Sequence, residues 1–517
     1  MANQLFQKKS IDKLIADADS PGHRLRKTLG PWSLTALGIG AIIGTGIFIL
    51  TGTAAAGEVL EVHSLLKAPL LDLVLHGTKA LGTAGRPGAG PGIALSFLLV
   101  AIACALAGLC YAELASMIPI AGSAYTYSYA TLGEIVAWII GWDLILEYAV
   151  SNMAVAVGFS AYIDRLLAGF GLHIPAIISR PVFDDSLQRT GSYFNVPGFL
   201  IVMILTVILV IGIRESAGAN NFMVCVKLLA IMIFIVAASR FIHVSNWKPF
   251  MPNGWQGVLT GGAIVFFTYI GFDSVSTAAE ECKNPQKDVP FGILASLVIC
   301  ATHYVTVALV LTGVQNWQTL RNAAPVANAL MALGLPNVMK WVSIGALTGM
   351  ISSMLVFQLG QARVWFAMSR DGLLPQVFSR VHTRFLTPYI STWVAGFAVA
   401  IPAGLFNIGT LADLSNIGTL FAFVLVSLGV LVLRRTQPER RRSFRTPWVP
   451  VVPILSILSC VVLMASLPLE TWVRFVVWLI IGLCIYLTYS RYHSEFGSAP
   501  RPPANAGSLP VNVHPAL

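Results

Sequence analysis

Long apolar runs, separated by short polar segments, dominate the chain. We place them at 34–56, 93–118, 135–168, 197–213, 217–239, 257–281, 290–314, 338–368, 389–406, 410–433, 449–467 and 471–490. A helix of roughly 20 apolar residues crosses the ~30 Å hydrocarbon core of a bilayer. The pattern therefore predicts an all-α polytopic membrane protein with about twelve transmembrane helices. No proline or glycine-rich turn divides the long run 135–168, so we expect one helix there.

Composition indicates that a bilayer is the natural solvent of this chain. Of its 517 residues 56% are hydrophobic and only 11% are charged, whereas a soluble domain carries roughly 25% charged residues. The first 31 residues are polar, so a cleavable secretory signal is not expected.

The net charge of +10 is better explained by membrane topology than by nucleic-acid binding. With a cytoplasmic N-terminus, 21 of the 33 Lys and Arg residues fall in cytoplasmic segments, 11 in outer segments and Lys227 within a span. Because positive charge concentrates on the cytoplasmic side, we expect a multi-pass protein of the inner or plasma membrane with both termini in the cytoplasm. The basic stretch 434–445 is then a topology anchor, with anionic lipid as an alternative contact.

Five parts follow from this division. They are a cytoplasmic N-terminal segment 1–33, a first five-span repeat 34–239, a second five-span repeat 257–433, two further spans within 449–490, and a disordered cytoplasmic tail 491–517. The outer loop 57–92 is long and mixes Gly, Pro and charge, so we expect a surface helix or a flexible loop there.

Glycine interrupts two of the spans near their middles. The first span contains Gly38, Gly40, Gly44 and Gly46 in GIGAIIGTGIF, and the sixth contains Gly271 in FFTYIGFDSVS. Broken helices at matching points of two halves are the best sequence pointer to the binding site of a transporter. Close packing of small residues is the alternative for either span alone, but the matching positions favour a site.

The chemistry of such breaks suits a zwitterionic amino acid. A half-helix N-terminus offers free N–H groups and partial positive charge to a carboxylate, and glycine lets the ligand approach the backbone. We expect the N–H groups of Gly44, Thr45 and Gly46 to bind the carboxylate. The ammonium would then bind carbonyls near Ile42 and from Phe267 to Ile270, where a broken helix leaves acceptors free.

Lys227 lies within the apolar fifth span, where a charge costs at least about 2.5–3.5 kcal/mol. A buried ammonium loses its proton more readily than an exposed one, so we favour Lys227 as a proton carrier. The alternative is a side chain that snorkels to the cytoplasmic interface.

Other polar residues in the spans are weaker candidates. Asp143 and Glu147 lie one turn apart on one helix face; Glu147 is the deeper, and a structural hydrogen bond is nearly as well supported. Asp273 is expected to cap the second half-helix. Ser352 and Ser353 are candidates to bind a cation or Lys227, or to bond their own helix.

Three glutamates near the cytoplasmic ends, Glu113, Glu280 and Glu281, are expected to act in gating or to be solvated. Arg363, Arg370 and Asp371 lie at the inner end of the eighth span, and we expect them to fix a helix end rather than to bind substrate. The seven cysteines form no C-x-x-C pair, and neither H-E-x-x-H nor a Cys/His cluster is present. We therefore expect no metal, no cofactor and no enzymatic activity.

Four stretches resemble a known family. HRLRKTLGPWSLTALGIGAIIGTGIFILTG resembles the start of the amino acid–polyamine–organocation permeases. AGSAYTYSYATLGEIVAWIIGWDLILEYAV, FFTYIGFDSVSTAAEECKNPQKDVPFGI and QARVWFAMSRDGLLP narrow the resemblance to the cationic amino acid transporter-like branch, of bacterial type. The match extends over nearly the whole chain, although loop 57–92 is longer than usual and the tail is atypical.

The resemblance implies the leucine-transporter fold, in which spans 1–5 and 6–10 form inverted repeats with broken helices 1 and 6. It implies carboxylate binding at Gly44–Gly46 and ammonium binding at the carbonyls of Ile42, Phe267 and Ile270, with Ile43, Gly271 and Asp273 at the same two breaks. It also implies a side-chain pocket that includes Phe267, Phe272 and Met354.

For coupling, the resemblance implies that Lys227 lies between spans 1 and 8, where sodium-coupled relatives hold their sodium ion. Glu147 matches a glutamate connected with transport in this branch.

The leading functional hypothesis is a proton-coupled symporter that moves amino acids by alternating access, with small neutral amino acids favoured over cationic ones. The alternatives are an amino-acid or polyamine exchanger, a sodium-coupled symporter and, from another class, a membrane amino-acid sensor. The expected partners are an amino acid, protons and bilayer lipid but no nucleic acid. A small accessory membrane subunit is left open.

Overall fold

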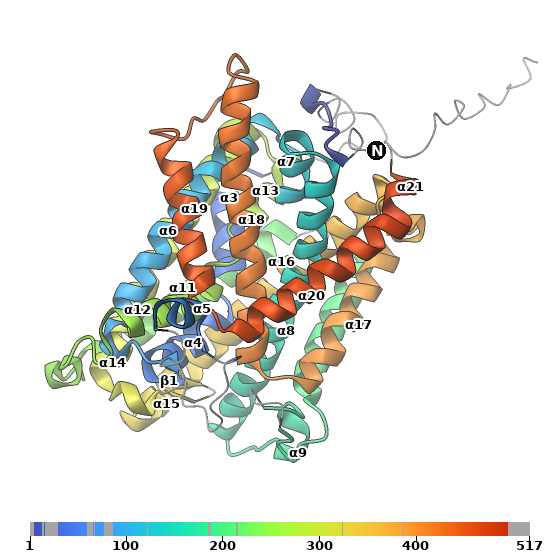
Figure 1. The fold of residues 1–517 in the computed structure, drawn as a ribbon. Helices are drawn as coiled ribbons and strands as arrows, with labels where there is room; N and C mark the ends of the chain where they lie inside the picture. The colour runs from blue at the N-terminus through green and yellow to red at the C-terminus, as the bar shows by residue number, and fades with distance from the viewer. Residues whose placement is uncertain are drawn as a thin grey trace, which may run out of the picture.

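The computed structural model describes residues 5–12, 15, 29–58, 66, 68–76, 86–120, 122–184, 188–212, 216–322, 324–385 and 387–494. Within these ranges the chain is a bundle of long helices that run roughly along one axis, with short elements at both ends (Figure 1). The apolar runs predicted from the sequence coincide with single helices, except that the runs 34–56 and 257–281 form interrupted segments. The disordered tail was predicted for 491–517, and its part beyond residue 494 lies outside the described residues, as does most of the N-terminal segment.

The first half of the bundle begins with two half-helices that meet at an angle of 44°. They are α3 (Pro31–Ile42) and α4 (Thr45–Ala56), followed by α6 (Ile93–Met117), α7 (Ser123–Thr131), α8 (Glu134–Ala168), α9 (Ala176–Ser179), α10 (Val196–Ile211) and α11 (Ser216–Ser239). The run 135–168 forms the single helix α8, as expected.

The second half also begins with an interrupted segment. It comprises α12 (Gly254–Val265), a 3-10 turn at Phe266–Tyr269 and the short α13 (Ser274–Thr277). The helices that follow are α14 (Pro285–Val314), α15 (Pro325–Ala332), α16 (Pro336–Arg370), α17 (Tyr389–Leu405), α18 (Ile408–Thr436), α19 (Val451–Ala465), α20 (Leu469–Ile485) and α21 (Arg491–His493).

Within the described residues, eight helical segments and the bent α3–α4 pair are long and apolar enough to cross a membrane. Three further apolar helices, α10, α17 and α19, have 16, 17 and 15 residues. The chain is therefore a multi-pass membrane protein. Twelve crossings in two inverted repeats remain a prediction, because these three helices are shorter than the length that spans ~30 Å.

The two ends of the bundle differ in character. At the end where α18 stops, arginines of the α18–α19 connection pack against α6; we call this the arginine end. The opposite end carries β1 (Gly57–Glu58), α9 and α15 (Figure 1), and we call it the hairpin end.

Loop 57–92 is more ordered at its borders than expected. β1 pairs antiparallel with β2 (Arg86–Pro87), with Gly57 opposite Pro87 and Glu58 opposite Arg86. The short apolar stretch of the loop forms α5 (Leu70–His76), which agrees with a surface helix. No strand was predicted, because two residues on each side carry no alternating pattern.

The interior is packed by helices with buried apolar faces and several buried aromatic rings. Helices α6 and α14, and α8 with α16 and α18, form the most extensive contacts. Indole rings of Trp138, Trp142 and Trp478 stack in sequence and fasten α20 to α8. This scaffold surrounds both interrupted segments.

Candidate functional site

The first break separates two half-helices at Ile43 and Gly44. Helix α3 ends at Ile42 and α4 starts at Thr45, so the two intervening residues leave helical geometry. The N–H of Gly44 donates to the carbonyl of Ile42 at 3.0 Å. The first N–H groups of α4, beginning at Thr45 and Gly46, have no partner within their own helix. Three N–H groups were predicted to bind a carboxylate. Those of Thr45 and Gly46 lie at the start of α4, whereas that of Gly44 is bonded to the Ile42 carbonyl.

The second break lies at Ile270 and Gly271. Ile270 is extended with a ψ of 137°, and Gly271 has a φ of +114°, a conformation that favours glycine. The carbonyl of Phe267 accepts the N–H of Ile270 at 3.3 Å. Both interruptions predicted from glycine positions are therefore present in the backbone.

The two breaks face one another. A Cβ atom at Gly271 would lie 2.8 Å from the Cβ of Ala41, and one at Gly46 would lie 2.5 Å from Cγ2 of Thr268. These glycines thus also allow close packing of small residues, which was the alternative to a binding site. They let α3 and α4 lie against the second interrupted segment.

Tyr304 of α14 joins the breaks and was not predicted. Its hydroxyl lies 3.0 Å from the Ile42 carbonyl and 2.8 Å from the Thr268 carbonyl. These two carbonyls are among those expected to bind the ammonium of the substrate. The Tyr304 hydroxyl therefore occupies the position in which a substrate ammonium would donate its hydrogen bonds. The only sequence signal was a tyrosine within the apolar run 290–314, whose hydroxyl needs a partner when buried.

The other predicted substrate residues are almost fully buried. Thr45, Phe267, Ile270, Phe272, Asp273 and Met354 are at most 5% exposed. The Phe272 ring packs against Tyr111 and Phe423, so it belongs to an aromatic cluster of α6 and α18. Met354 follows Ser353 on α16.

Lys227 of α11 is fully buried and reaches the first break. Its Nζ donates to the carbonyls of Gly40 at 2.8 Å and Ile43 at 2.9 Å. Its side chain also lies against α16, because a Cβ at Gly349 would be 3.2 Å from Lys227 Cδ. The snorkelling alternative is therefore wrong in this structure, and Lys227 lies between the first and eighth spans as the resemblance implied.

Two serines of α16 complete the surroundings of the α3 end. Ser353 donates to the Ala41 carbonyl at 2.7 Å, and Ser352 donates to Asn220 Oδ1 at 2.9 Å. Asn220 in turn donates to the Ala36 carbonyl at 3.3 Å. The serines thus contact the α3 half-helix rather than Lys227 itself.

The acidic residues of α8 lie apart from these carbonyls. Neither carboxylate oxygen of Asp143 or Glu147 accepts a hydrogen bond from the described residues, and both side chains are buried. Asp273 does not cap α13 through its side chain; it accepts the Tyr148 hydroxyl at 2.9 Å. The capping prediction for Asp273 was wrong, because its carboxylate points toward α8.

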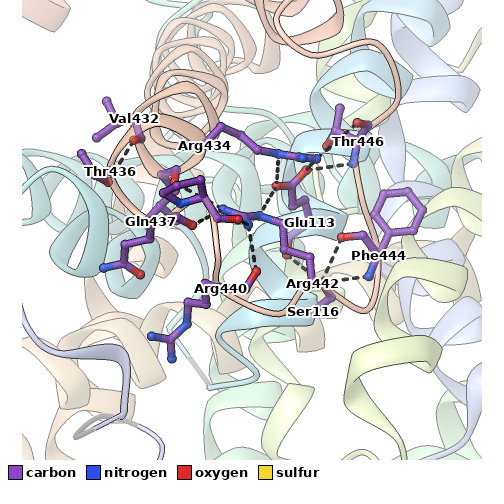
Figure 2. Close-up of polar contacts among 12 residues, drawn as sticks. Glu113, Ser116, Val432, Arg434, Thr436, Gln437, Arg440, Arg442, Phe444 and Thr446 are labelled. Carbon is purple, nitrogen blue, oxygen red and sulfur yellow. Dashed lines mark hydrogen bonds and ion pairs between the residues drawn. The ribbon is translucent and has the colours of Figure 1, made fainter.

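Figure 2 shows a buried hub at the arginine end, centred on Glu113 of α6. Arg434 donates to both carboxylate oxygens at 2.8 and 2.9 Å, Arg442 donates at 3.1 Å, and the Thr446 N–H donates at 2.8 Å. Arg442 is 7% exposed and also bonds four backbone carbonyls. Glu113 is 1% exposed, so the expectation that it is solvated was wrong, while a role in gating stays a prediction. Its carboxylate organises the α18–α19 connection.

Further contacts close the arginine end. Glu281 pairs with Arg363 at 2.6 Å, and Asp371 accepts from Lys9 and Tyr125. Leu29 pairs with Cys282 in an isolated bridge, so the segment before α3 lies against the residues that follow α13. The backbone of Glu280 belongs to the 3-10 turn Ala279–Glu281, and its side chain lies outside the described part of the structure.

At the hairpin end a cavity of about 220 Å³ opens between α4, α8, α12 and α18. Arg86 stands in its wall and donates to Glu58 at 2.6 Å and, with two nitrogens, to Asp413 at 2.9 and 2.6 Å. Burial alone would lower the pKa of Arg86, but the adjacent carboxylates of Asp413 and Glu58 raise it above its ordinary value. None of these residues was a sequence-based candidate, because their meeting depends on the pairing of β1 with β2.

Comparisons with known proteins agree with this architecture. A polytopic helical protein with two facing backbone breaks belongs to the class of secondary transporters. The family model "Amino acid permease" matches residues 29–489, and the chain belongs to this family of transporters, which are not enzymes. It is 47% identical to the branched-chain amino acid permease BcaP of Bacillus subtilis (strain 168), over 96% of this chain and 99% of the relative.

Two further relatives are named for different substrates. The chain is 45% identical to the methylthioribose transporter of Bacillus subtilis (strain 168), over 95% of this chain and 99% of the relative. It is 32% identical to the chloroplastic cationic amino acid transporter 9 of Arabidopsis thaliana, over 92% and 90%. These relatives support amino acid transport, and they extend the resemblance to the cationic amino acid transporters.

Proposed function

We propose that this protein binds an amino acid zwitterion at the two facing breaks and moves it across the membrane by alternating access. The observation that carries the proposal is the meeting of the breaks: Gly46 against Thr268, Gly271 against Ala41, and Tyr304 between the carbonyls of Ile42 and Thr268. The start of α4 supplies N–H groups for a carboxylate, and the carbonyls now bonded to Tyr304 supply acceptors for an ammonium.

For the side chain we favour a neutral amino acid over a cationic one. The acidic residue nearest to the second break, Asp273, has its carboxylate bonded to Tyr148, and the surrounding Phe267, Ile270 and Met354 are apolar. The surroundings are thus mainly apolar, and a cationic side chain is costly in a buried site unless it is paired with a carboxylate. Two relatives named as branched-chain amino acid permeases, at 47% and 32% identity, support the same choice.

A second candidate substrate is methylthioribose, because a relative of 45% identity is named as its transporter. This thioether sugar carries neither carboxylate nor ammonium. It could therefore use neither the N–H groups at the start of α4 for a carboxylate nor the carbonyls at the breaks for an ammonium. We rank it second for this reason.

We further propose that transport is coupled to protons through Lys227, with sodium symport and exchange as the alternatives. Its ammonium is held by two carbonyls at the end of α3, where a cation would otherwise be needed to match the negative end of a half-helix. In this proposal the arginine end faces the cytoplasm, in agreement with the distribution of Lys and Arg, and the hairpin end faces outward.

Uptake by the purified full-length protein in liposomes tests the function. The panel contains labelled leucine, valine, alanine, lysine and methylthioribose, each with and without an imposed pH gradient, and empty liposomes serve as the control. We expect leucine and valine to accumulate, and a gradient with the acidic side outside to increase accumulation. Accumulation of methylthioribose alone would favour the second candidate, and no uptake of any amino acid would contradict the proposal.

A further inference from the structure

Tyr304 of α14 is held rigidly between the two breaks. Its side chain is fully buried, and its ring packs against the rings of Phe97 on α6 and Tyr269 in the second interrupted segment, with centroids 5.5 and 5.1 Å away. The Tyr269 hydroxyl in turn donates to the Phe97 carbonyl at 3.0 Å. Contacts of this kind fix a side chain in a close-packed interior. The position of the Tyr304 hydroxyl is therefore determined by ring packing as well as by its own hydrogen bonds.

This hydroxyl has one proton for two acceptors. It lies 3.0 Å from the Ile42 carbonyl and 2.8 Å from the Thr268 carbonyl, although a phenol donates a single hydrogen bond. The Ile42 carbonyl also accepts the Gly44 N–H at 3.0 Å, whereas the Thr268 carbonyl accepts no other hydrogen bond from the described residues. An ammonium carries three protons and can satisfy both carbonyls at once. The hydroxyl is therefore a weaker form of the donor that a zwitterionic substrate brings to the same place.

Tyr304 is also the link between the two interrupted segments. Among the residues that the structure describes, no other side chain forms hydrogen bonds to both of them; the Lys227 ammonium bonds to Gly40 and Ile43 of the first break. The Ile42 and Thr268 carbonyl oxygens lie close together, because both are within 3.0 Å of one hydroxyl oxygen. Two buried carbonyls that approach one another with no proton between them are costly.

The cost matters in one half of a transport cycle. In alternating access one bundle moves against another around a fixed site, so the two interrupted segments must keep their relation while the site changes sides. In the loaded protein the substrate ammonium joins them. A carrier that accumulates its substrate must also return empty, whereas an exchanger always returns loaded. The empty return therefore needs a donor from the protein itself.

We propose that the Tyr304 hydroxyl replaces the substrate ammonium in the empty protein, and that this replacement permits the empty return and hence net accumulation rather than exchange alone. Tyr304 is thus a positioning residue for the unloaded half of the cycle. It is not a ligand of the substrate, because the substrate takes over its two acceptors. The inference rests on the proposed function, since it assumes that an amino acid zwitterion binds at the breaks.

Tyr304→Phe tests this role in the full-length protein, because it removes the hydroxyl and keeps the ring. The probe is the labelled amino acid that the wild type takes up most in the liposome panel. Net uptake into liposomes without internal amino acid should fall at least about tenfold, as expected when a buried carbonyl loses its donor. Exchange into liposomes preloaded with the same unlabelled amino acid should stay close to the wild-type rate. Equilibrium binding should be unchanged or tighter, since the ammonium no longer competes with the hydroxyl.

Tyr162→Phe is the matched control. Tyr162 of α8 is equally buried, and its hydroxyl donates to the Phe48 carbonyl of α4 at 2.9 Å, so this variant also removes a buried bond to the first span. That bond lies outside both breaks. Net uptake and exchange by Tyr162→Phe should therefore keep their wild-type ratio.

Each outcome decides the matter. Net uptake and exchange reduced in the same proportion in Tyr304→Phe would show a purely structural role. Weaker or absent binding would show that the hydroxyl is needed for the site itself, and either result overturns the inference. A wild type that exchanges but does not accumulate also overturns it, while the proposed transport of amino acids stands. If the wild type neither accumulates nor exchanges any amino acid, the proposed function fails as well.

Discussion

A single ammonium group holds the end of a half-helix in this protein. Lys227 donates to two carbonyls that α3 leaves free where it stops, and it is fully buried against α16. Its side chain thus links the fifth span, the eighth span and the first break. A change in its protonation alters the bonding of the break itself.

Replacement of Lys227 by an uncharged residue should reduce transport and remove its response to pH. In Lys227→Met the Ile43 carbonyl loses its donor, which costs about 1–3 kcal/mol for an unsatisfied buried group, whereas the Gly40 carbonyl keeps the Ser353 hydroxyl at 3.2 Å. Uptake in liposomes should fall at least tenfold. The remaining uptake should not change between pH 5.5 and 8. Lys248→Met, an exposed position, is the control, and an unchanged pH response in Lys227→Met would exclude the proton role.

Gly271 should tolerate no side chain. Alanine there adopts a φ of +114° and places its Cβ 2.8 Å from Ala41, so both strain, of about 1–3 kcal/mol, and a clash are introduced. The thermal unfolding midpoint of Gly271→Ala should therefore fall. Gly171→Ala separates the two causes, since Gly171 also has a positive φ of +77° but open space around it. A drop no larger than that of Gly171→Ala would show that the contact with Ala41 is dispensable.

The role of a residue could be predicted only where its type is unusual for its position in the sequence. Glycines in the middle of a span and a lysine in an apolar run are such anomalies, and both lie where expected. Tyr304 is not anomalous, because tyrosine is common in spans, and its importance arises from two carbonyls of distant segments. The direction of the Asp273 side chain likewise depends on Tyr148, which is 125 residues away.

At the scale of elements, the connection between α18 and α19 is fastened by one carboxylate. Glu113 accepts from Arg434, Arg442 and the Thr446 backbone, so α6 determines the course of a segment more than 300 residues further along the chain. The basic stretch 434–445 was predicted as a topology anchor with anionic lipid as an alternative contact. For Arg434 and Arg442 the contact is Glu113, while Arg440 pairs with Asp12.

Loss of the Glu113 charge should destabilise the protein strongly. Glu113→Gln leaves the buried Arg442 guanidinium without its counter-charge, and breaking a buried pair costs about 3–5 kcal/mol. Glu470→Gln serves as the comparison, because Glu470 pairs with Arg474 one helical turn away at a more exposed position, where a pair contributes roughly 0.3–0.5 kcal/mol. Thermal unfolding in one detergent measures both, and equal shifts would contradict the hub.

At the scale of the whole molecule, the two ends differ in access. The hairpin end contains a cavity beside the first break, whereas Glu281–Arg363 and the Leu29–Cys282 bridge cover the arginine end. With the proposed orientation, the cavity lies toward the outside and the covered end lies toward the cytoplasm.

Cys282 reports on the closed end. It is fully buried, and burial raises the pKa of its thiol to about 11. The thiolate is the reactive form, so at pH 8 maleimide labelling should be about a hundredfold slower than for an ordinary thiol and should increase as the pH approaches 11. Labelling is measured in a variant with Cys225→Ser and Cys484→Ser, since these two cysteines are exposed. Labelling at the rate of a free thiol would show that the arginine end is open.

The overall architecture was predictable to a greater degree than its details. The lengths of the apolar runs were sufficient to predict the positions of the helices. A segment within the bilayer must form all its backbone hydrogen bonds internally, which a helix does. The β1–β2 pairing, the charged wall at Arg86 and the Glu113 hub depend on residues that meet across the fold, and a sequence pattern with a period of two or 3.6 residues contains no information on such meetings.

The short helices α10 and α17 have a consequence for the surrounding lipid. They pack against each other and present apolar side chains outward, among them Ile204 and Phe397. At 1.5 Å per residue, 16 and 17 residues extend only about 24–26 Å, less than the ~30 Å hydrocarbon thickness. A helix that is too short is accommodated by local thinning of the bilayer. In the proposed twelve-span arrangement we therefore expect the membrane to be thinned on this side, so that acyl-chain length acts on the conformational equilibrium of the protein.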